Sequence, residues 1–169
     1  MQAWSNAEQL RVWYQYFLGI RPDMIHHRVL LAPRIPQELT NLIYHVKVGG
    51  GTIEAEYSAN SAEQMYTYRF KGIKLTAVID IAPFDELEFE AEAETELRIS
   101  RTEQGLAIEL VNSSGGIIRM LNVQPSTARI EQQMHSDKVF AGVHFAEPLA
   151  LENHPVMERK ITKVVQTEE

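Results

Sequence analysis

The segment between positions 86 and 94 constrains the fold most, because apolar and charged side chains alternate there without interruption. Leu87, Phe89, Ala91 and Ala93 occupy the odd positions, and glutamate occupies every even position. Glutamate and alanine favour helices, but a period of two places all the apolar side chains on one face only in an extended strand. We therefore expect a strand at 87–93 whose charged outer face suits the edge of a sheet.

Other short apolar segments recur along the chain and are separated by turns such as Gly49-Gly50-Gly51. This spacing predicts a mainly β protein, an antiparallel β-sandwich of about ten strands, with a barrel as the alternative arrangement. One N-terminal α-helix is expected to pack against it. The segment 127–134 fits either a strand or a helical turn. The remaining strands are expected at 28–32, 42–48, 52–57, 65–70, 73–81, 97–100, 106–111, 117–123, 138–145 and near 159–165.

The N-terminal segment reads as one helix with a signal at each end. Ser5 is a good N-cap, and Glu8 stands three residues later, at the spacing of a capping box. Gly19 ends the helix where a left-handed residue is wanted, and Pro22 prevents its resumption. A helix of about 14 residues is marginal in water by itself, so its wide apolar face must pack on something.

Three ordered pieces of the first third of the chain resemble a known enzyme family. They are Gln-Ala-Trp-Ser-Asn-Ala-Glu at 2–8, Phe-Leu-Gly-Ile-Arg-Pro-Asp at 17–23 and Leu-Leu-Ala-Pro-Arg-Ile-Pro at 30–36. Together they are similar to the C-terminal end of bacterial glycogen-debranching-type (amylo-α-1,6-glucosidase-like) glycoside hydrolases. In that family the Gln-Ala-Trp-Ser element opens the final helix of an (α/α)6 barrel, and a β-rich C-terminal domain can follow.

The resemblance implies a domain organisation and a partner. Residues 1–23 would be the terminal helix of a helical barrel domain that this sequence lacks, and 24–169 would be a single β-sandwich domain. The family's acid and base carboxylates lie upstream of the Gln-Ala-Trp-Ser element, so they have no counterpart here. The chain alone would then be a non-catalytic cap or support of the catalytic barrel of the same parent chain. A carbohydrate-binding module and a free-standing ligand- or protein-binding domain are the alternatives.

Three aromatic residues are the candidates for carbohydrate binding, with an oligosaccharide as the ligand. Tyr66 and Tyr68 alternate with polar residues on one strand face, and aromatic rings offer flat apolar faces to sugars. Trp4 stands in the element that resembles the barrel helix. The competing interpretation is packing in the core for the tyrosines, and for Trp4 packing onto the helix's own domain.

Composition excludes several classes of function. The chain has no cysteine, which rules out disulfides and thiolate chemistry, and its net charge of −7 disfavours nucleic acid. No apolar run is long enough to cross a membrane. The lack of cysteine and of a signal peptide in this sequence favours a cytoplasmic location. We expect no cofactor, no metal and no catalytic residue, because the histidines lack metal-ligand spacing and the glutamates of 86–94 all face solvent.

Overall fold

A computed structural model describes residues 3–36 and 38–131. Helix α1 (Ala3–Arg11) continues directly into the π-helical segment η1 (Val12–Phe17). Ten strands follow within the described residues: β1 (Ile20–Asp23), β2 (Arg28–Leu31), β3 (Asn41–Val48), β4 (Gly51–Ala59), β5 (Glu63–Lys71), β6 (Leu75–Ile79), β7 (Leu87–Ala91), β8 (Glu96–Thr102), β9 (Leu106–Val111) and β10 (Ile117–Val123). The mainly β class and the N-terminal helix are therefore as expected. The strands expected at 138–145 and 159–165 lie outside the described residues.

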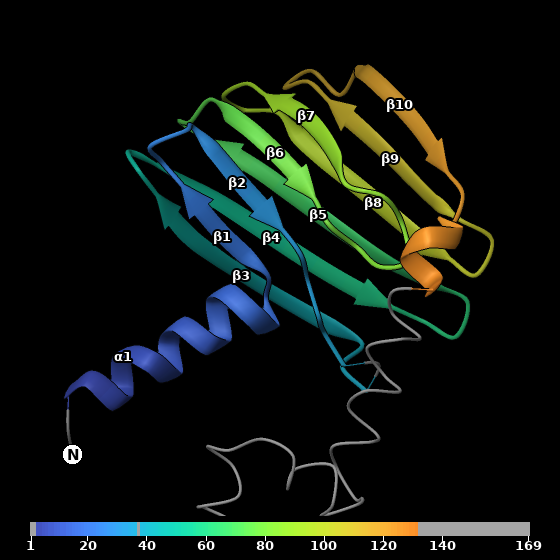
Figure 1. The fold of residues 1–169 in the computed structure, drawn as a ribbon. Helices are drawn as coiled ribbons and strands as arrows, with labels where there is room; N and C mark the ends of the chain where they lie inside the picture. The colour runs from blue at the N-terminus through green and yellow to red at the C-terminus, as the bar shows by residue number, and fades with distance from the viewer. Residues whose placement is uncertain (1–2, 37, 132–169) are drawn as a thin grey trace, which may run out of the picture. The chain divides into compact units, whose positions relative to one another are not determined.

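The strands form two sheets that stack face to face (Figure 1). One sheet has four strands in the order β1-β2-β6-β7, and the other has six in the order β10-β9-β8-β5-β4-β3. Strand β7 carries the glutamates of the alternating segment and lies at the edge of its sheet, as the sequence predicted. Exposed Glu88 and Glu90 flank buried Phe89 on this strand, so the period of two sorts the side chains by face.

One strand pair departs from the expected antiparallel arrangement. All pairs of the six-stranded sheet are antiparallel, but β2 and β6 are parallel, with Arg28 opposite Thr76 and Leu31 opposite Ile79. Between them the chain builds β3, β4 and β5 in the other sheet and then returns. The connection therefore crosses between the two layers, which fixes the order of the four-stranded sheet.

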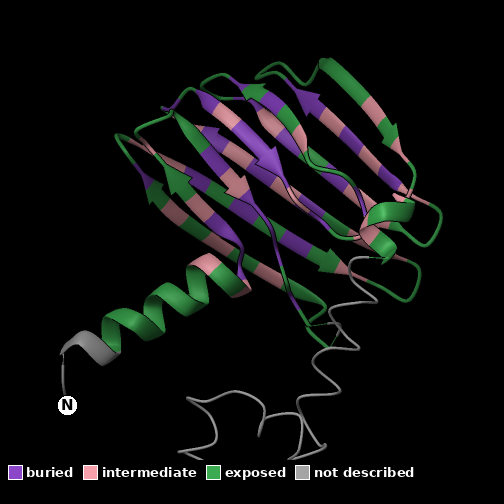
Figure 2. Cartoon of the chain, viewed as in Figure 1, coloured by how far each residue is buried: buried purple, intermediate pink, exposed green. Residues whose placement is uncertain are grey.

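The core fills the space between the two sheets (Figure 2). Alternate positions of each strand point inward, as on β4, where Ile53, Ala55 and Tyr57 are buried while the residues between them are exposed. The same alternation on β5 buries Tyr66, Tyr68 and Phe70. Burial of apolar area of this kind is the main stabilising contribution in a sandwich.

Local differences from the expected elements occur mainly in the first quarter of the chain. The helix already includes Ala3, so Ser5 lies inside it rather than at its cap. The segment after Gly19 forms β1, a strand that was not expected; Pro22 lies within it. The segment 127–131 is helical, which decides between the two alternatives for that region.

The chain divides into two compact units. The first, Met1–Ser126, contains every strand named above together with α1 and η1, and the second begins at Thr127. None of the helices in the described part of the chain has the length and apolar character needed to cross a membrane.

Candidate functional site

Close backbone contacts connect the end of the helix to the sandwich. Gly19 ends the helix with φ of +72°, and a Cβ atom at this position would lie 2.1 Å from the carbonyl carbon and oxygen of Ala32. Two backbone bonds join the same segments, from Ala32 N–H to Gly19 O at 2.8 Å and from Arg34 N–H to Phe17 O at 3.0 Å. The residues just after β2 therefore hold the end of the helix in place.

Side chains reinforce this joint. The Nε of Arg21 donates to the carbonyl oxygen of Gln15 at 2.7 Å, and its guanidinium lies 4.9 Å from the centre of the Tyr16 ring. The hydroxyl of Tyr44 on β3 donates to the carbonyl oxygen of Leu18 at 3.4 Å, and burial raises the pKa of this hydroxyl to about 12. A cation near the last carbonyls of a helix is favourable, because those groups carry partial negative charge.

Most of the helix beyond this joint is exposed (Figure 2). We call its large apolar side chains the helix surface: Leu10, Val12, Trp13, Tyr14 and Tyr16. Both Leu10 and Trp13 are 58% exposed, whereas Phe17 is half-buried and packs against the core. The helix therefore meets the sandwich through its last turn, and its earlier turns keep their apolar side chains in solvent. Large clustered apolar side chains in water often mark a surface that meets another protein body.

The residues predicted to bind carbohydrate are separated by the fold. Tyr66 and Tyr68 belong to the core and are only 3% and 1% exposed, so neither ring presents a face to solvent. The ring of Tyr66 instead packs on Tyr57, with centroids 5.0 Å apart. This is the arrangement expected for the competing interpretation, core packing. Trp4 lies in α1, far along the chain from both tyrosines, and its side chain is outside the described residues.

The hydroxyl groups of the core tyrosines mark a polar region between the sheets. The Tyr68 hydroxyl is buried with no hydrogen-bond partner among the described residues, and burial raises its pKa well above the usual value. The Tyr66 hydroxyl donates to Oε1 of Gln64 at 3.3 Å. Burial, followed by the nearby Tyr57, raises the pKa of Tyr66 to about 12, although the charge of Arg101 opposes this.

A cavity of about 450 Å³, lined by both polar and apolar groups, opens beside Gln64 and Arg101. Its walls come from the turn between β4 and β5, from the end of β8 and from Thr40. Sequence reasoning missed this cavity. The signal was present, because Gln64 and Arg101 occupy inward positions in the alternation of β5 and β8 where apolar residues are otherwise found.

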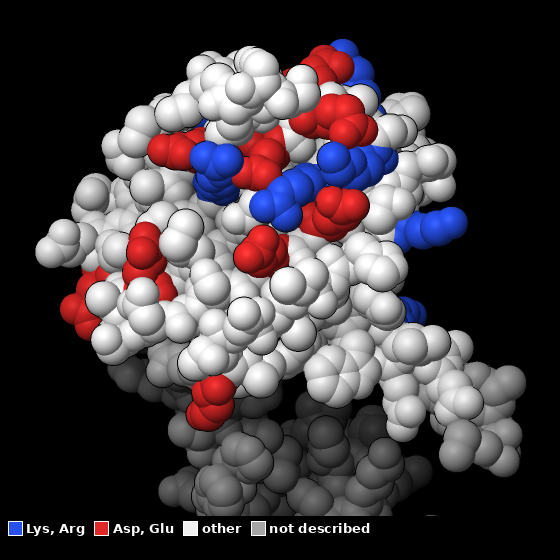
Figure 3. Space-filling view, turned by 180° about the vertical axis from the view of Figure 1, so that it is seen from behind, with Lys and Arg blue, Asp and Glu red and all other residues white. Residues whose placement is uncertain are grey.

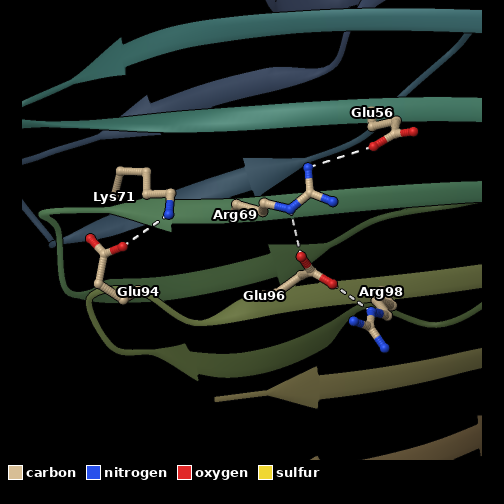
Figure 4. A network of polar contacts seen from close by, with 6 residues as sticks. All are labelled: Glu56, Arg69, Lys71, Glu94, Glu96 and Arg98. Atoms are coloured by element: carbon tan, nitrogen blue, oxygen red, sulfur yellow. Dashed lines mark hydrogen bonds and ion pairs between the residues drawn. The ribbon is translucent and has the colours of Figure 1, made fainter. Parts of the chain in front are cut away.

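The outer face of the six-stranded sheet carries a network of ion pairs. Seen from behind, positive and negative side chains interleave on the molecule (Figure 3). Arg69 contacts Glu56 at 3.5 Å and Glu96 at 2.6 Å, and Glu96 also accepts from Arg98 at 2.5 Å (Figure 4). Lys71 pairs with Glu94 at 3.0 Å. Each charge in this network has a partner of opposite sign, so the network itself is close to neutral.

Three glutamates in β7 and in the turn after it likewise each contact a different partner. Glu88 pairs with Arg28 at 3.0 Å, Glu92 with Lys74 at 2.5 Å, and Glu90 accepts from the Thr76 hydroxyl at 2.8 Å. A calcium site needs several oxygens converging on one point. In the described ranges no three acidic, histidine or cysteine side chains are grouped so that they could hold a metal ion.

Comparison with known proteins gives no relative: no protein-family model, no curated protein and no solved structure matches this chain.

Proposed function

We propose that this chain is a non-catalytic C-terminal β domain of a glycogen-debranching-type glycoside hydrolase, and that it supports the catalytic helical barrel of the same parent protein. The observation that carries the proposal is the helix surface. Its five apolar side chains project from a helix whose last turn is fixed to the sandwich by Gly19 and Phe17. This helix is attached to the sandwich at its last turn, and its earlier turns carry exposed apolar side chains. Such an arrangement is suited to a helix that packs between two domains.

The energetics favour a second body against this helix. Burying a large apolar side chain completely contributes about 1.5–3 kcal/mol. Trp13 and Leu10 are each more than half exposed, so roughly half of that contribution is unrealised for each of them. Five such side chains together leave on the order of 5 kcal/mol available for packing against a partner. A partner built of helices suits this surface, because helix ridges pack into the grooves of other helices.

The proposal assigns the reaction to the barrel and not to this domain. A glycosidase needs two carboxyl groups that flank the scissile bond with separations of roughly 5–9.5 Å. Acidic side chains on the sheet faces, such as Glu96 and Glu92, are instead engaged in ion pairs with arginine or lysine. In the family that the N-terminal segments resemble, the acid and base precede the Gln-Ala-Trp-Ser element. The reaction of the parent would be hydrolysis of an α-glucosidic linkage.

The first test is the size of the native protein in its source cells, detected with an antibody raised against this chain. A band several times larger than 19.3 kDa supports the proposal. A single band at the size of this chain would refute it.

The second test uses variants and the upstream barrel added as a separate protein. The double variant W13S/Y16S should fold but should lose at least tenfold in affinity for the barrel, because its helix surface is disrupted. The double variant I43S/M65S is the matched control, since Ile43 and Met65 are exposed apolar residues on the six-stranded sheet. Equal loss of affinity in both variants would contradict the assignment of the interface to the helix.

A further inference from the structure

The cavity between the β4–β5 turn and the end of β8 has the dimensions of a small-molecule site. Its volume of about 450 Å³ falls within the range of roughly 300–1,000 Å³ that is typical of ligand pockets. The residues that matter for its chemistry are Thr40, Asn60, Ser61, Gln64, Arg101 and Glu103. This set offers hydroxyl, amide and guanidinium groups to a polar ligand, and Ala59, Ala62, Glu63 and Thr102 complete the lining.

Gln64 holds the arginine of this cavity in place. Its Oε1 accepts from Nη1 of Arg101 at 3.2 Å and from the Tyr66 hydroxyl at 3.3 Å. Its Nε2 donates to the Tyr57 hydroxyl at 3.4 Å. The amide is thus fixed by three contacts, two of which reach the tyrosine layer of the core. A guanidinium positioned by a fixed neighbour loses little rotamer freedom when it binds a ligand.

Arg101 has no direct ion-pair partner among the described residues, although the carboxylates of Glu63 and Glu103 line the same cavity. Arg101 is partly buried, yet it forms no ion pair with any carboxylate in residues 3–36 and 38–131. Arg69 shows the contrast, because it lies between two glutamates. Of the two acidic residues beside the cavity, Glu63 accepts from the Ser100 hydroxyl, and Glu103 is exposed. Partly buried charges are normally paired, so the guanidinium is suited to an anion from outside.

We propose that this cavity binds a hydroxylated monocarboxylate of the sugar-acid class, with the carboxylate on Arg101. The planar fork of a guanidinium matches a carboxylate with two parallel hydrogen bonds. Thr40 and Ser61 supply hydroxyls for the hydroxyl groups of the ligand. Glu63 and Glu103 disfavour a dianion such as phosphate more strongly than a monoanion. The site belongs to the sandwich and uses none of the helix surface, so it is independent of the function proposed above.

The experiment is a titration of the full 169-residue chain with D-glucuronate, followed by heteronuclear NMR. D-glucose tests the need for the carboxylate, and inorganic phosphate tests the preference for a monoanion. Glucuronate should shift the backbone signals of Ser61 and Thr102 in a saturable way, while glucose should not bind. No saturable binding of glucuronate, equal binding of glucose or tighter binding of phosphate would each overturn the proposal.

Three variants at two positions of β8 locate the site. Arg101→Gln should weaken glucuronate binding at least tenfold, because it removes both the charge and the paired hydrogen bonds to the carboxylate. Arg98→Gln is the matched control, since Arg98 lies on the opposite, exposed face of β8. This variant should bind glucuronate as tightly as the unsubstituted chain does. Arg101→Lys keeps the positive charge but lacks the planar guanidinium, so this variant should bind glucuronate more weakly than the unsubstituted chain does. Unchanged affinity in Arg101→Lys, or equal losses in the two glutamine variants, would overturn the assignment.

Discussion

The ring of Trp13 packs edge-on against the ring of Phe17, with 4.8 Å between their centroids and 71° between their planes. The two side chains have different surroundings, because Trp13 is 58% exposed while Phe17 packs against the core. Phe17 therefore joins the helix to the core, and Trp13 packs on Phe17 from the solvent side.

The first prediction separates these two aromatic residues. Trp13→Ala should lower the free energy of unfolding by about 1 kcal/mol, the contribution of an exposed aromatic pair. Phe17→Ala should lower it by about 2–3 kcal/mol, since it also removes core contacts. Chemical denaturation followed by circular dichroism measures both values. A loss of more than about 3 kcal/mol for Trp13→Ala would mean that the ring is buried within this chain.

The second prediction concerns the glycine at the helix joint. Gly19→Ala should destabilise the chain by more than about 3 kcal/mol, because the new Cβ would meet the backbone of Ala32 in addition to the strain of a positive φ. Gly72→Ala is the control, since its φ is +63° but no atom lies within 4 Å of the place that the new methyl group would occupy. Strain alone should cost Gly72→Ala about 1–2 kcal/mol. Equal losses in thermal or chemical unfolding would exclude the close contact as the cause.

The third prediction is a loss of stability at alkaline pH. Burial raises the pKa of Tyr44 and of Tyr66 to about 12, whereas both titrate near the ordinary value of 10.0 when the chain unfolds. Their contribution is complete below pH 10 and is lost as the pH rises toward 12, since only the unfolded chain releases protons there. Each tyrosine should account for roughly 2 kcal/mol of this loss. Tyr66→Phe should flatten the dependence, which denaturation at a series of pH values can measure.

The fourth prediction is the acid counterpart, and it concerns Glu96. Burial raises the pKa of Glu96, but hydrogen bonds from Arg98 and Arg69 outweigh it and hold the value below the ordinary 4.5. The stabilisation is therefore complete above that pH and is lost as the pH falls through the lowered pKa. Glu96→Gln should cost about 1 kcal/mol at neutral pH and should weaken the dependence on acid, as denaturation at several pH values would reveal. Glu54→Gln, at an exposed glutamate on the same face that forms no ion pair among the described residues, should cost less stability at neutral pH than Glu96→Gln.

Most of the strand positions could be predicted because their side chains alternate. Strands β3, β4, β5, β8 and β9 each keep a period of two, and β7 keeps it with glutamates at alternate positions. Strand β1 was missed because Pro22 signals a break, yet a proline is tolerated at the edge of a sheet, where β1 lies. The parallel pairing of β2 with β6 depends on contacts between distant segments, which local patterns do not encode.

The candidate sites show the same limit. The alternation around Tyr66 and Tyr68 fitted both sugar stacking and core packing, and the structure buries both side chains in the core. The cavity was not predictable as a whole, since its walls combine Asn60, Arg101 and Thr40 from three separate turns and strand ends. Only the polar residues at inward positions could have pointed to it, and such residues also occur in ordinary hydrogen-bonded cores.

The parallel pairing of β2 with β6 also sets an order of assembly during synthesis. Val29 and Leu31 emerge from the ribosome early, but their neighbours Ala77 and Ile79 are made only after β3, β4 and β5. Until then the β1–β2 hairpin, and the helix joined to it, lack the strand that completes their sheet. A nascent chain that stops before β6 therefore leaves the N-terminal helix attached to an unfinished layer, at a stage when β3, β4 and β5 are the strands of the six-stranded sheet that have already been made.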